Sequence, residues 1–173
     1  SAAVEAGVAR LDEFESDMRA QGARALRRVR DLGARAVVLA GRPYHVDPAV
    51  HHGIPDLLRS CGYGVLTDDS LGEVAKGARG AGGVSPAGWE YPARVLAAAE
   101  FAAENDDVDL VELYSFGCGI DAVTTDKVKD VMSARGGVFA ALKIDEMVDL
   151  AATRIRIRSM KAVRDGVLGA RAR

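Results

Sequence analysis

The hydrophobic and polar positions of the chain follow two alternating periods, which predict short strands separated by amphipathic helices. Four short apolar runs end at glycine or charged residues, a pattern typical of buried parallel strands. They cover residues 36–40, 63–67, 108–114 and 138–144. Between these runs, apolar residues recur every three or four positions, which predicts helices. The predicted helices cover a short stretch that begins at Asp47 and Pro48, then residues 54–61, 92–104 and 120–134, and a final helix that Asp149 caps.

The beginning of the chain predicts one long helix, from residue 3 to about residue 32, with Gly33 as its end. Its apolar positions fall mostly at spacings of three and four: Val4, Val8, Leu11, Phe14, Met18, Ala25 and Val29. A break near Gly22 is the alternative for a helix of this length. We expect the helix to pack on the domain or on a neighbour outside these residues. The chain then divides into a helical segment, residues 1–34, and an α/β domain, residues 35–173.

The order of these elements predicts the fold class. Helices alternate with strands, and parallel strands need crossover helices, so a parallel sheet with helices on both faces follows. We expect an α/β fold that is flavodoxin-like (Rossmann-like), with four strands in the order 2-1-3-4 and a long N-terminal helix. In that order the topological switch point lies between the first and third strands, where ligands of α/β proteins bind.

Three segments should meet at the carboxyl edge of this sheet, because each follows a strand. They are Gly41–His45, in which Pro43 holds the loop extended, Ser115–Asp121 and Asp145–Glu146. The topology would place Arg42 and His45 beside Cys118. The candidate residues around a ligand bound at this edge are Arg42, His45, Ser115, Gly117, Gly119, Asp145 and Glu146.

Cys118 has two interpretations, which the residues alone leave open. As a functional residue it would be a thiolate of low pKa, because the start of the following helix stabilises negative charge and the flanking glycines admit a bulky group. As a structural residue it would be a small apolar side chain at a tight turn. A nucleophilic cysteine would need a base, and His45 is the histidine with a suitable predicted location. No catalytic residue is assigned.

Other polar residues also have alternatives. Arg42 would either bind an anion as a bidentate hydrogen-bond donor or pair with Asp68, Asp145 or Glu146 to hold the loops together. Cys61 lies on the apolar face of a helix and is predicted to belong to the core. No two cysteines have the spacing of a zinc site. His51 and His52 are predicted to be exposed or to cap a helix.

The composition excludes several classes of function. The chain of 173 residues has a net charge of −2, which argues against a general nucleic-acid binder. Neither a membrane-spanning run nor a signal peptide is apparent, and two cysteines do not make a disulfide framework, so we expect a cytoplasmic protein. Residues 72–88 hold six glycines and predict a long loop, but no phosphate-binding loop and hence no ATP site. The chain begins abruptly with Ser1, so we expect a fragment of a longer protein.

The final helix is predicted to carry many basic residues. From residue 154 onward there are seven lysines and arginines against Asp165, a net charge of +6. The basic residues alternate with apolar ones and so wrap around the helix. They suit either a basic surface for a nucleotide-like cofactor or an acidic neighbouring domain, or a solvated tail.

Five segments resemble one protein family when they are taken in order. They are AGRPYHVDPAVHHGIPDLL, GVLTDDSL, WEYPARVLAAAEFA, LVELYSFGCGIDAVTTDKV and LKIDEMVDLAATRIRIRS. They resemble the large acyl-CoA dehydratase activase-related proteins, homologous to subunits of 2-hydroxyacyl-CoA dehydratases such as 2-hydroxyglutaryl-CoA dehydratase. The resemblance covers residues 36 to about 163 and implies one domain of a larger, ATP-linked electron-transfer system for acyl-CoA dehydration or reduction.

The resemblance also implies a cofactor and partners. Cys118 matches the cysteine of the FGCG motif, which makes it a ligand of a [4Fe-4S] cluster shared with cysteines of other domains. The partners it implies are other domains of the same longer chain, a second copy of the chain, and acyl-CoA. These residues lack the ATPase domain and further ligand cysteines, so we expect the isolated domain to be inactive and without cluster. The alternatives are a non-catalytic scaffold domain that packs on the ATPase or a second subunit, and a stand-alone cysteine hydrolase or nucleotide-binding module.

Overall fold

A parallel sheet of four strands forms the centre of the protein. The computed structural model describes residues 1–72, 89–115, 117–144 and 150–171. The strands are β1 (Arg35–Ala40), β2 (Tyr63–Thr67), β3 (Val108–Tyr114) and β4 (Phe139–Lys143). They lie in the order β2-β1-β3-β4, and every neighbouring pair is parallel. The predicted α/β fold and strand order are confirmed, and the switch point lies between β1 and β3.

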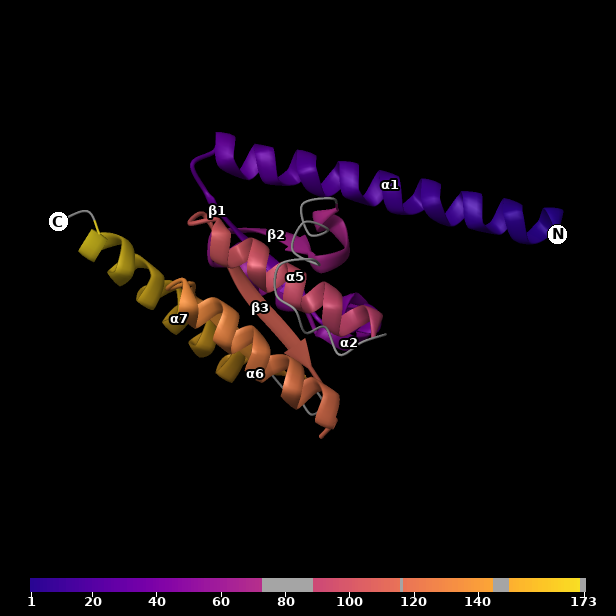
Figure 1. Cartoon of the computed structure of the whole chain (residues 1–173). Helices are drawn as coiled ribbons and strands as arrows, with labels where there is room; N and C mark the ends of the chain where they lie inside the picture. The colour runs from indigo at the N-terminus through magenta and orange to yellow at the C-terminus, as the bar shows by residue number, and fades with distance from the viewer. Residues whose placement is uncertain (73–88, 116, 145–149, 172–173) are drawn as a thin grey trace.

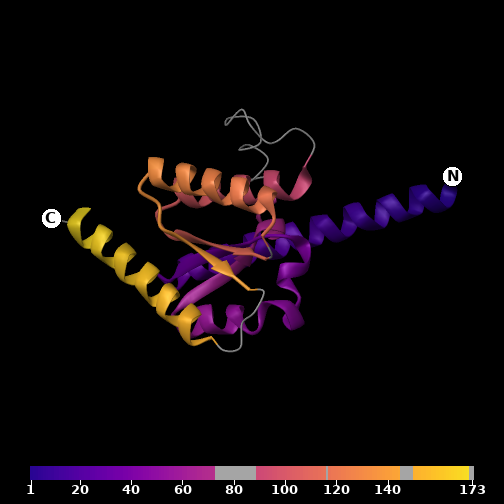
Figure 2. The ribbon, with the colours of Figure 1, turned by 90° about the horizontal axis from the view of Figure 1, so that it is seen from below.

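Helices cover both faces of the sheet (Figure 1 and Figure 2). One face carries α5 (Glu90–Glu104) and α6 (Gly119–Ala134), together with the C-terminal part of α1 (Ala2–Asp31). The other face carries α2 (Pro48–His51), α3 (Ile54–Ser60) and α7 (Ala151–Arg171). Two short 3₁₀ helices, η1 (Pro43–Val46) and η2 (Asp68–Leu71), follow β1 and β2.

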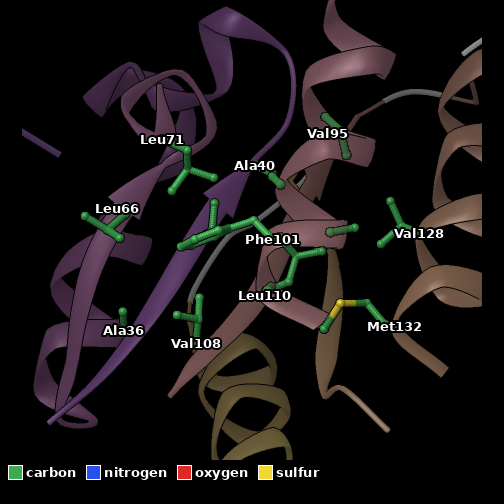
Figure 3. Close-up of a cluster of buried hydrophobic side chains, with 14 residues drawn as sticks. Ala36, Ala40, Leu66, Leu71, Val95, Phe101, Val108, Leu110, Val128 and Met132 are labelled. Carbon is green, nitrogen blue, oxygen red and sulfur yellow. The ribbon is translucent and has the colours of Figure 1, made fainter. Parts of the chain in front are cut away.

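The cores on the two faces explain why the strands are apolar without alternation. Successive residues of a strand point to opposite faces, so a strand covered on both sides is apolar throughout. On β3, Val108 and Leu110 join the core under α5 and α6, while Val111 and Leu113 join the core under α3 and α7. Figure 3 shows the first core, where Phe101 of α5 and Met132 of α6 lie over the strands.

The ends of the helices follow the predicted capping residues. Gly33, just beyond α1, has a φ of +61°, a conformation that glycine adopts without strain. Asp47 caps α2, since its side chain accepts a hydrogen bond of 2.8 Å from the amide of Ala49. The side chain of His51 accepts a hydrogen bond from the amide of Gly53, as a capping role predicts.

The predicted single helix at the start of the chain is confirmed, because α1 is continuous from Ala2 to Asp31 and the alternative of a break near Gly22 does not occur. Gly22 is buried instead where the helix crosses η2, and an added Cβ would lie 2.1 Å from the carbonyl oxygen of Ser70. The loop after β1 is not extended beyond Arg42, because Pro43 begins η1 and supplies the φ of its first position.

The inner faces of α6 and α7 combine apolar and polar residues. Val123 of α6, whose apolar character favours an inward position, is 54% exposed, and the apolar residues Ile155 and Val163 of α7 are 67% and 56% exposed. The inner stripe of α6 is Asp121, Thr124, Val128 and Met132, and that of α7 is Thr153, Ile157, Met160 and Arg164. Each stripe contains polar residues that are buried through hydrogen bonds and ion pairs, so apolar periodicity alone does not define either face.

Arg164 is part of a buried ion cluster and not of a basic surface. The carboxylate of Asp109 on β3 is fully buried and accepts from Arg164 Nε at 2.7 Å and from Arg35 Nη2 at 3.0 Å. Tyr63 of β2 donates to the same carboxylate at 3.0 Å. The cluster therefore ties α7 to three strands at the amino edge of the sheet. Asp109 and Arg164 are both buried, so loss of Asp109 would leave the positive charge of Arg164 buried without its partner.

The other predictions about loops and helix ends concern residues outside the described part of the chain. The glycine-rich loop from residue 73 to residue 88, Asp145, Glu146 and the predicted cap Asp149 fall outside it. Within the described residues, none of the helices combines the length and apolar character needed to cross a membrane.

The Asp109 cluster predicts a large loss of stability on substitution. We expect Asp109→Ala to lower the free energy of unfolding by about 3–5 kcal/mol, because the buried Arg164 and the partly buried Arg35 lose their counter-charge. Urea denaturation followed by circular dichroism measures this loss. The matched control is Glu104→Ala, which removes the exposed pair of Glu104 and Arg135 and should cost less than about 1 kcal/mol. Equal losses in the two variants would contradict the assignment.

Candidate functional site

The site lies at the carboxyl edge of the sheet, at the switch point between β1 and β3. Strand β1 leads into Arg42 and η1, and β3 leads into Ser115 and the turn that starts α6. The two strands are neighbours, with Ala40 opposite Glu112, and β3 continues two residues further to Tyr114, so both end at the same edge of the sheet. The structure thus brings two of the three predicted segments together, and the third, Asp145–Glu146, falls outside the described residues.

Cys118 occupies the N-cap position of α6 and is partly exposed. Its thiol makes no side-chain capping hydrogen bond within the part of the chain described. The amide N–H of Ile120 lowers the pKa of the thiol most, followed by that of Asp121; burial opposes the shift, and the Arg42 guanidinium adds to it. The two amides belong to the first turn of α6, whose N–H groups and positive dipole end favour an anion, and the guanidinium adds a positive charge. Cys118 therefore has the surroundings of a thiolate.

The two glycines beside Cys118 leave space around the thiol. Gly117 and Gly119 are exposed, and a Cβ added to either would meet nothing within 4 Å among the described atoms. Neither has a positive φ, so the backbone conformation alone does not require glycine there. Their absent side chains instead leave open the approach to Cys118.

Arg42 is held beside the thiol by a carboxylate and a phenol. Its Nη2 and Nε atoms donate to Asp121 Oδ1 at 2.8 Å and 3.2 Å. Tyr91 of α5 donates to the same oxygen at 2.7 Å, and the guanidinium carbon lies 5.0 Å from the centre of its ring. The hydrogen bond to Asp121 raises the pKa of Arg42, whereas burial chiefly raises that of Tyr91. Three elements of the fold, η1, α5 and α6, thus meet in one polar contact.

Within the described residues, Arg42 pairs with Asp121, an acid that was not among its expected partners; Asp145 and Glu146 fall outside that part of the chain. Asp68 instead pairs with Arg94 at 3.2 Å. Asp121 is the third residue of α6, where a carboxylate is stabilised by the helix start as well as by the guanidinium.

His45 clamps the turn after β1 to the turn after β3. Its Nδ1 accepts from the amide of Arg42 at 3.1 Å, and its Nε2 lies 3.1 Å from Ser115 Oγ. Because Nδ1 is an acceptor, the neutral ring carries its proton on Nε2 and donates it to Ser115. Both nitrogens are therefore engaged, and the hypothesis of a Cys118–His45 catalytic pair loses its base. His45 positions the two loops.

Close packing beneath His45 requires glycine at position 41. A Cβ there would lie 2.6 Å from His45 Nδ1 and 2.7 Å from the carbonyl oxygen of Leu113. Tyr44 completes the clamp, since its hydroxyl lies 3.2 Å from Ser115 Oγ. The glycine that follows β1 thus serves the contact between the two loops.

Glu112 is a buried acid below the Arg42–Asp121 contact. Its Oε1 accepts from Thr125 Oγ1 at 3.0 Å, while Oε2 is buried without a partner among the described residues. Burial is the main cause that raises the pKa of Glu112 to about 7; the hydrogen bond from Thr125 opposes the shift, and the negative charge of Asp121 contributes to it. Asp121 Oδ2 is also buried without a described partner. Two carboxylates with one unsatisfied oxygen each therefore lie in the same region.

Three of these residues, Tyr91, Glu112 and Asp121, were not among the predicted site residues. Glu112 carried a signal, because a carboxylate inside an apolar strand must be paired, protonated or functional. Asp121 carried one too, as an acid in the first turn of the helix at the switch point. Tyr91 reaches the site only through the tertiary packing of α5, which no local pattern reveals.

The residues of this chain do not by themselves fit a [4Fe-4S] cluster. Such a cluster is held by four cysteine thiolates, and the chain has two cysteines. Cys61 follows α3 and precedes β2, so it lies toward the amino edge of the sheet, packed against the core, whereas Cys118 lies at the carboxyl edge. Among the described residues, no group of three or more histidines, cysteines, aspartates or glutamates is placed to hold a metal ion. This edge therefore offers one thiolate.

The raised pKa of Glu112 predicts a pH-dependent cost in stability. The folded protein holds the proton up to about pH 7, and an unfolded glutamate releases it near its ordinary value of 4.5. Stability therefore falls as pH rises between these values, by about 3 kcal/mol for the full shift. We expect Glu112→Gln to match the wild type at pH 5 and to be more stable at pH 8 by up to about this amount. Urea denaturation at both values measures the difference.

The exposed acid Asp130 on α6 supplies the control for this measurement. Asp130→Asn should change the free energy of unfolding little at either pH, because its side chain is exposed. A Glu112→Gln variant with the same stability relative to wild type at pH 5 and at pH 8 would refute the raised pKa.

The surroundings of Cys118 predict a reactive thiol that depends on Arg42. In a Cys61→Ser background, alkylation by iodoacetamide should report on Cys118 alone. Arg42→Gln should raise the pKa of the thiol, because the guanidinium no longer favours the thiolate, and should slow the reaction at pH 7. Arg94→Gln, which removes a guanidinium from Asp68 instead, should leave the rate unchanged. An unchanged rate in Arg42→Gln would show that the guanidinium does not act on the thiol.

Comparison with known protein families finds a match to the first part of the chain. Residues 1–71 match the family described as the CoA enzyme activase uncharacterised domain (DUF2229). The matched region runs from α1 to η2 and includes Arg42 and His45, whereas Cys118 and Asp121 lie outside it. Comparison with curated proteins and with solved structures finds no match for this chain. Residues 1–71 thus carry a domain that is found in CoA enzyme activases.

Proposed function

We propose that this chain is one domain of an ATP-linked electron-transfer system of the CoA enzyme activase type, which serves acyl-CoA dehydration or reduction. In this proposal Cys118 contributes one thiolate to an iron–sulfur site. The remaining ligands come from other domains of the same longer chain or from a second subunit. The match of residues 1–71 supports the class of protein, and the resemblance of the FGCG motif supports the role of Cys118.

One observation supports the ligand role most directly: Cys118 is partly exposed at the start of α6, where its pKa is lowered. A metal ligand must be deprotonated, so the amides of Ile120 and Asp121 and the guanidinium of Arg42 favour the form that binds metal. Gly117 and Gly119 leave space at the thiol for the approach of a second domain. A thiolate that is open to its surroundings and alone in its own domain suits a site that two domains share.

The surrounding residues have positioning roles in this proposal. His45 and Ser115 hold the turns after β1 and β3 together. Arg42 is fixed by Asp121 and brings positive charge toward the thiol. Such charge would stabilise either a thiolate or the anionic part of an acyl-CoA that approaches this edge.

The test is anaerobic reconstitution of the parent protein, with these residues in their natural context, followed by a count of bound iron. Cys118→Ser should lose bound iron, up to roughly four iron ions per protein if the cluster fails to assemble. Cys61→Ser is the matched control and should keep the iron of the wild type, because Cys61 packs against the core near the opposite edge. The electron paramagnetic resonance spectrum of the reduced protein gives a second readout.

A non-catalytic scaffold role is the second candidate, and the uncovered outer faces of α1 and α7 favour it. The same measurement distinguishes the two. Equal iron content in the wild type and in Cys118→Ser would refute the ligand role and leave the scaffold role as the function of this domain.

A further inference from the structure

The apolar stripe of α1 is covered over only half of its length. Toward the C-terminus, Leu26 and Val29 pack against the core, and Gly22 lies against Ser70. Toward the N-terminus the same stripe is exposed, although Leu11 and Phe14 also line a recess that η2 and α5 border. Its exposed members are Val4 at 63%, Val8 at 54%, Leu11 at 56% and Phe14 at 60%. Figure 1 and Figure 2 show this half of α1 extending beyond the sheet as an arm, which we define as residues 2–18.

The arm is acidic around its apolar stripe. Residues 1–18 contain five acidic side chains and one arginine, a net charge of −4 without the terminal amine. The acidic residues are Glu5, Asp12, Glu13, Glu15 and Asp17. Two arms placed against each other would bring like charges together, which is unfavourable. The partner that suits this stripe is an apolar surface with basic residues along its sides.

The outer face of α7 has that chemistry. Ile155 and Val163 are 67% and 56% exposed, and the small residues Ser159 and Ala162 lie exposed between them. The arginines at positions 154, 156 and 158 are exposed at the N-terminal end of the helix, against the single exposed acid Asp165 among residues 151–166. Arg164, by contrast, is buried with Asp109 and does not contribute. The outer face is therefore apolar and small along its centre and basic at its sides.

We propose that the arm of α1 packs against the outer face of α7 in a second copy of this chain. The lengths agree, since 17 residues of the arm and 16 residues of α7 (151–166) each span about 25 Å of helix. Burial of the exposed apolar residues on both sides supplies the driving force, and opposite charges set the partner and the orientation. The contact joins two different surfaces, so it is a head-to-tail contact, which closes into a ring or extends into a chain of copies. It is independent of the proposed function, because it uses no residue of the Cys118 site.

Charge reversal on the two helices tests the contact. Sedimentation velocity of the wild-type chain should show self-association that increases with protein concentration and weakens with added salt. Glu5→Lys with Asp12→Lys makes the arm basic, and Arg154→Glu with Arg158→Glu makes the face of α7 acidic. Each double variant should associate at least about tenfold more weakly than the wild type. An equal mixture of the two should associate again, because each arm then meets a face of opposite charge.

Charge reversal on a different helix, α6, provides the control for this contact. Asp126→Lys with Asp130→Lys changes as much charge on the exposed side of α6 and should leave the association unchanged. Circular dichroism checks that every variant keeps its helix content, which exposed positions should allow. A wild-type chain that stays monomeric at all concentrations overturns the proposal. A mixture of the two reversed variants that fails to associate also overturns it. Charge pairing would restore association in that mixture, whereas a loss of stability in either variant would not be restored there.

Discussion

The adjacency of β1 and β3 is the constraint on which the rest of the structure depends. These strands are parallel neighbours although β2, three α-helices and two 3₁₀ helices of the described residues lie between them in the chain. Because Ala40 is opposite Glu112, the segments after both strands leave the sheet at the same edge. The contact of Arg42 with Asp121 and that of His45 with Ser115 are direct results of this register. A shift of the strand pairing would separate both pairs at once.

The sequence allowed the prediction of the sheet and much of its edge, for physical reasons. Strands covered on both faces are continuous apolar runs, and their order follows from crossover helices and a switch point. Capping residues such as Asp47 and Gly33 act over a few residues, so they too are visible locally. What could not be predicted depends on which distant groups meet. The alternative of a break at Gly22 could not be excluded from the sequence, because the contact of Gly22 with Ser70 exists only once the helix crosses η2.

The same limit explains the candidate site. The switch point predicted that Arg42 would lie near the turn of Cys118, but the partner of Arg42 depends on the side-chain directions of three elements. His45 was a candidate base, and its role changed because both ring nitrogens are used in holding the loops. The buried Glu112 and Arg164 interrupt apolar stripes that sequence periodicity treats as uniform. Polar residues inside such stripes are the positions where sequence patterns and tertiary structure differ most.

The Asp109 cluster and the Cys118 turn lie at opposite ends of the same strand, and this separation has a consequence for how the domain can change. Strand β3 has seven residues and spans about 23 Å. At that distance two unit charges interact by only about 0.7 kcal/mol at an effective dielectric constant of 20, so a change of charge at one end has a small effect at the other. The amino edge can therefore anchor the C-terminal helix while the carboxyl edge acquires new side chains. Adaptation of the chemical edge to a different ligand need not be limited by the interactions that hold the domain together.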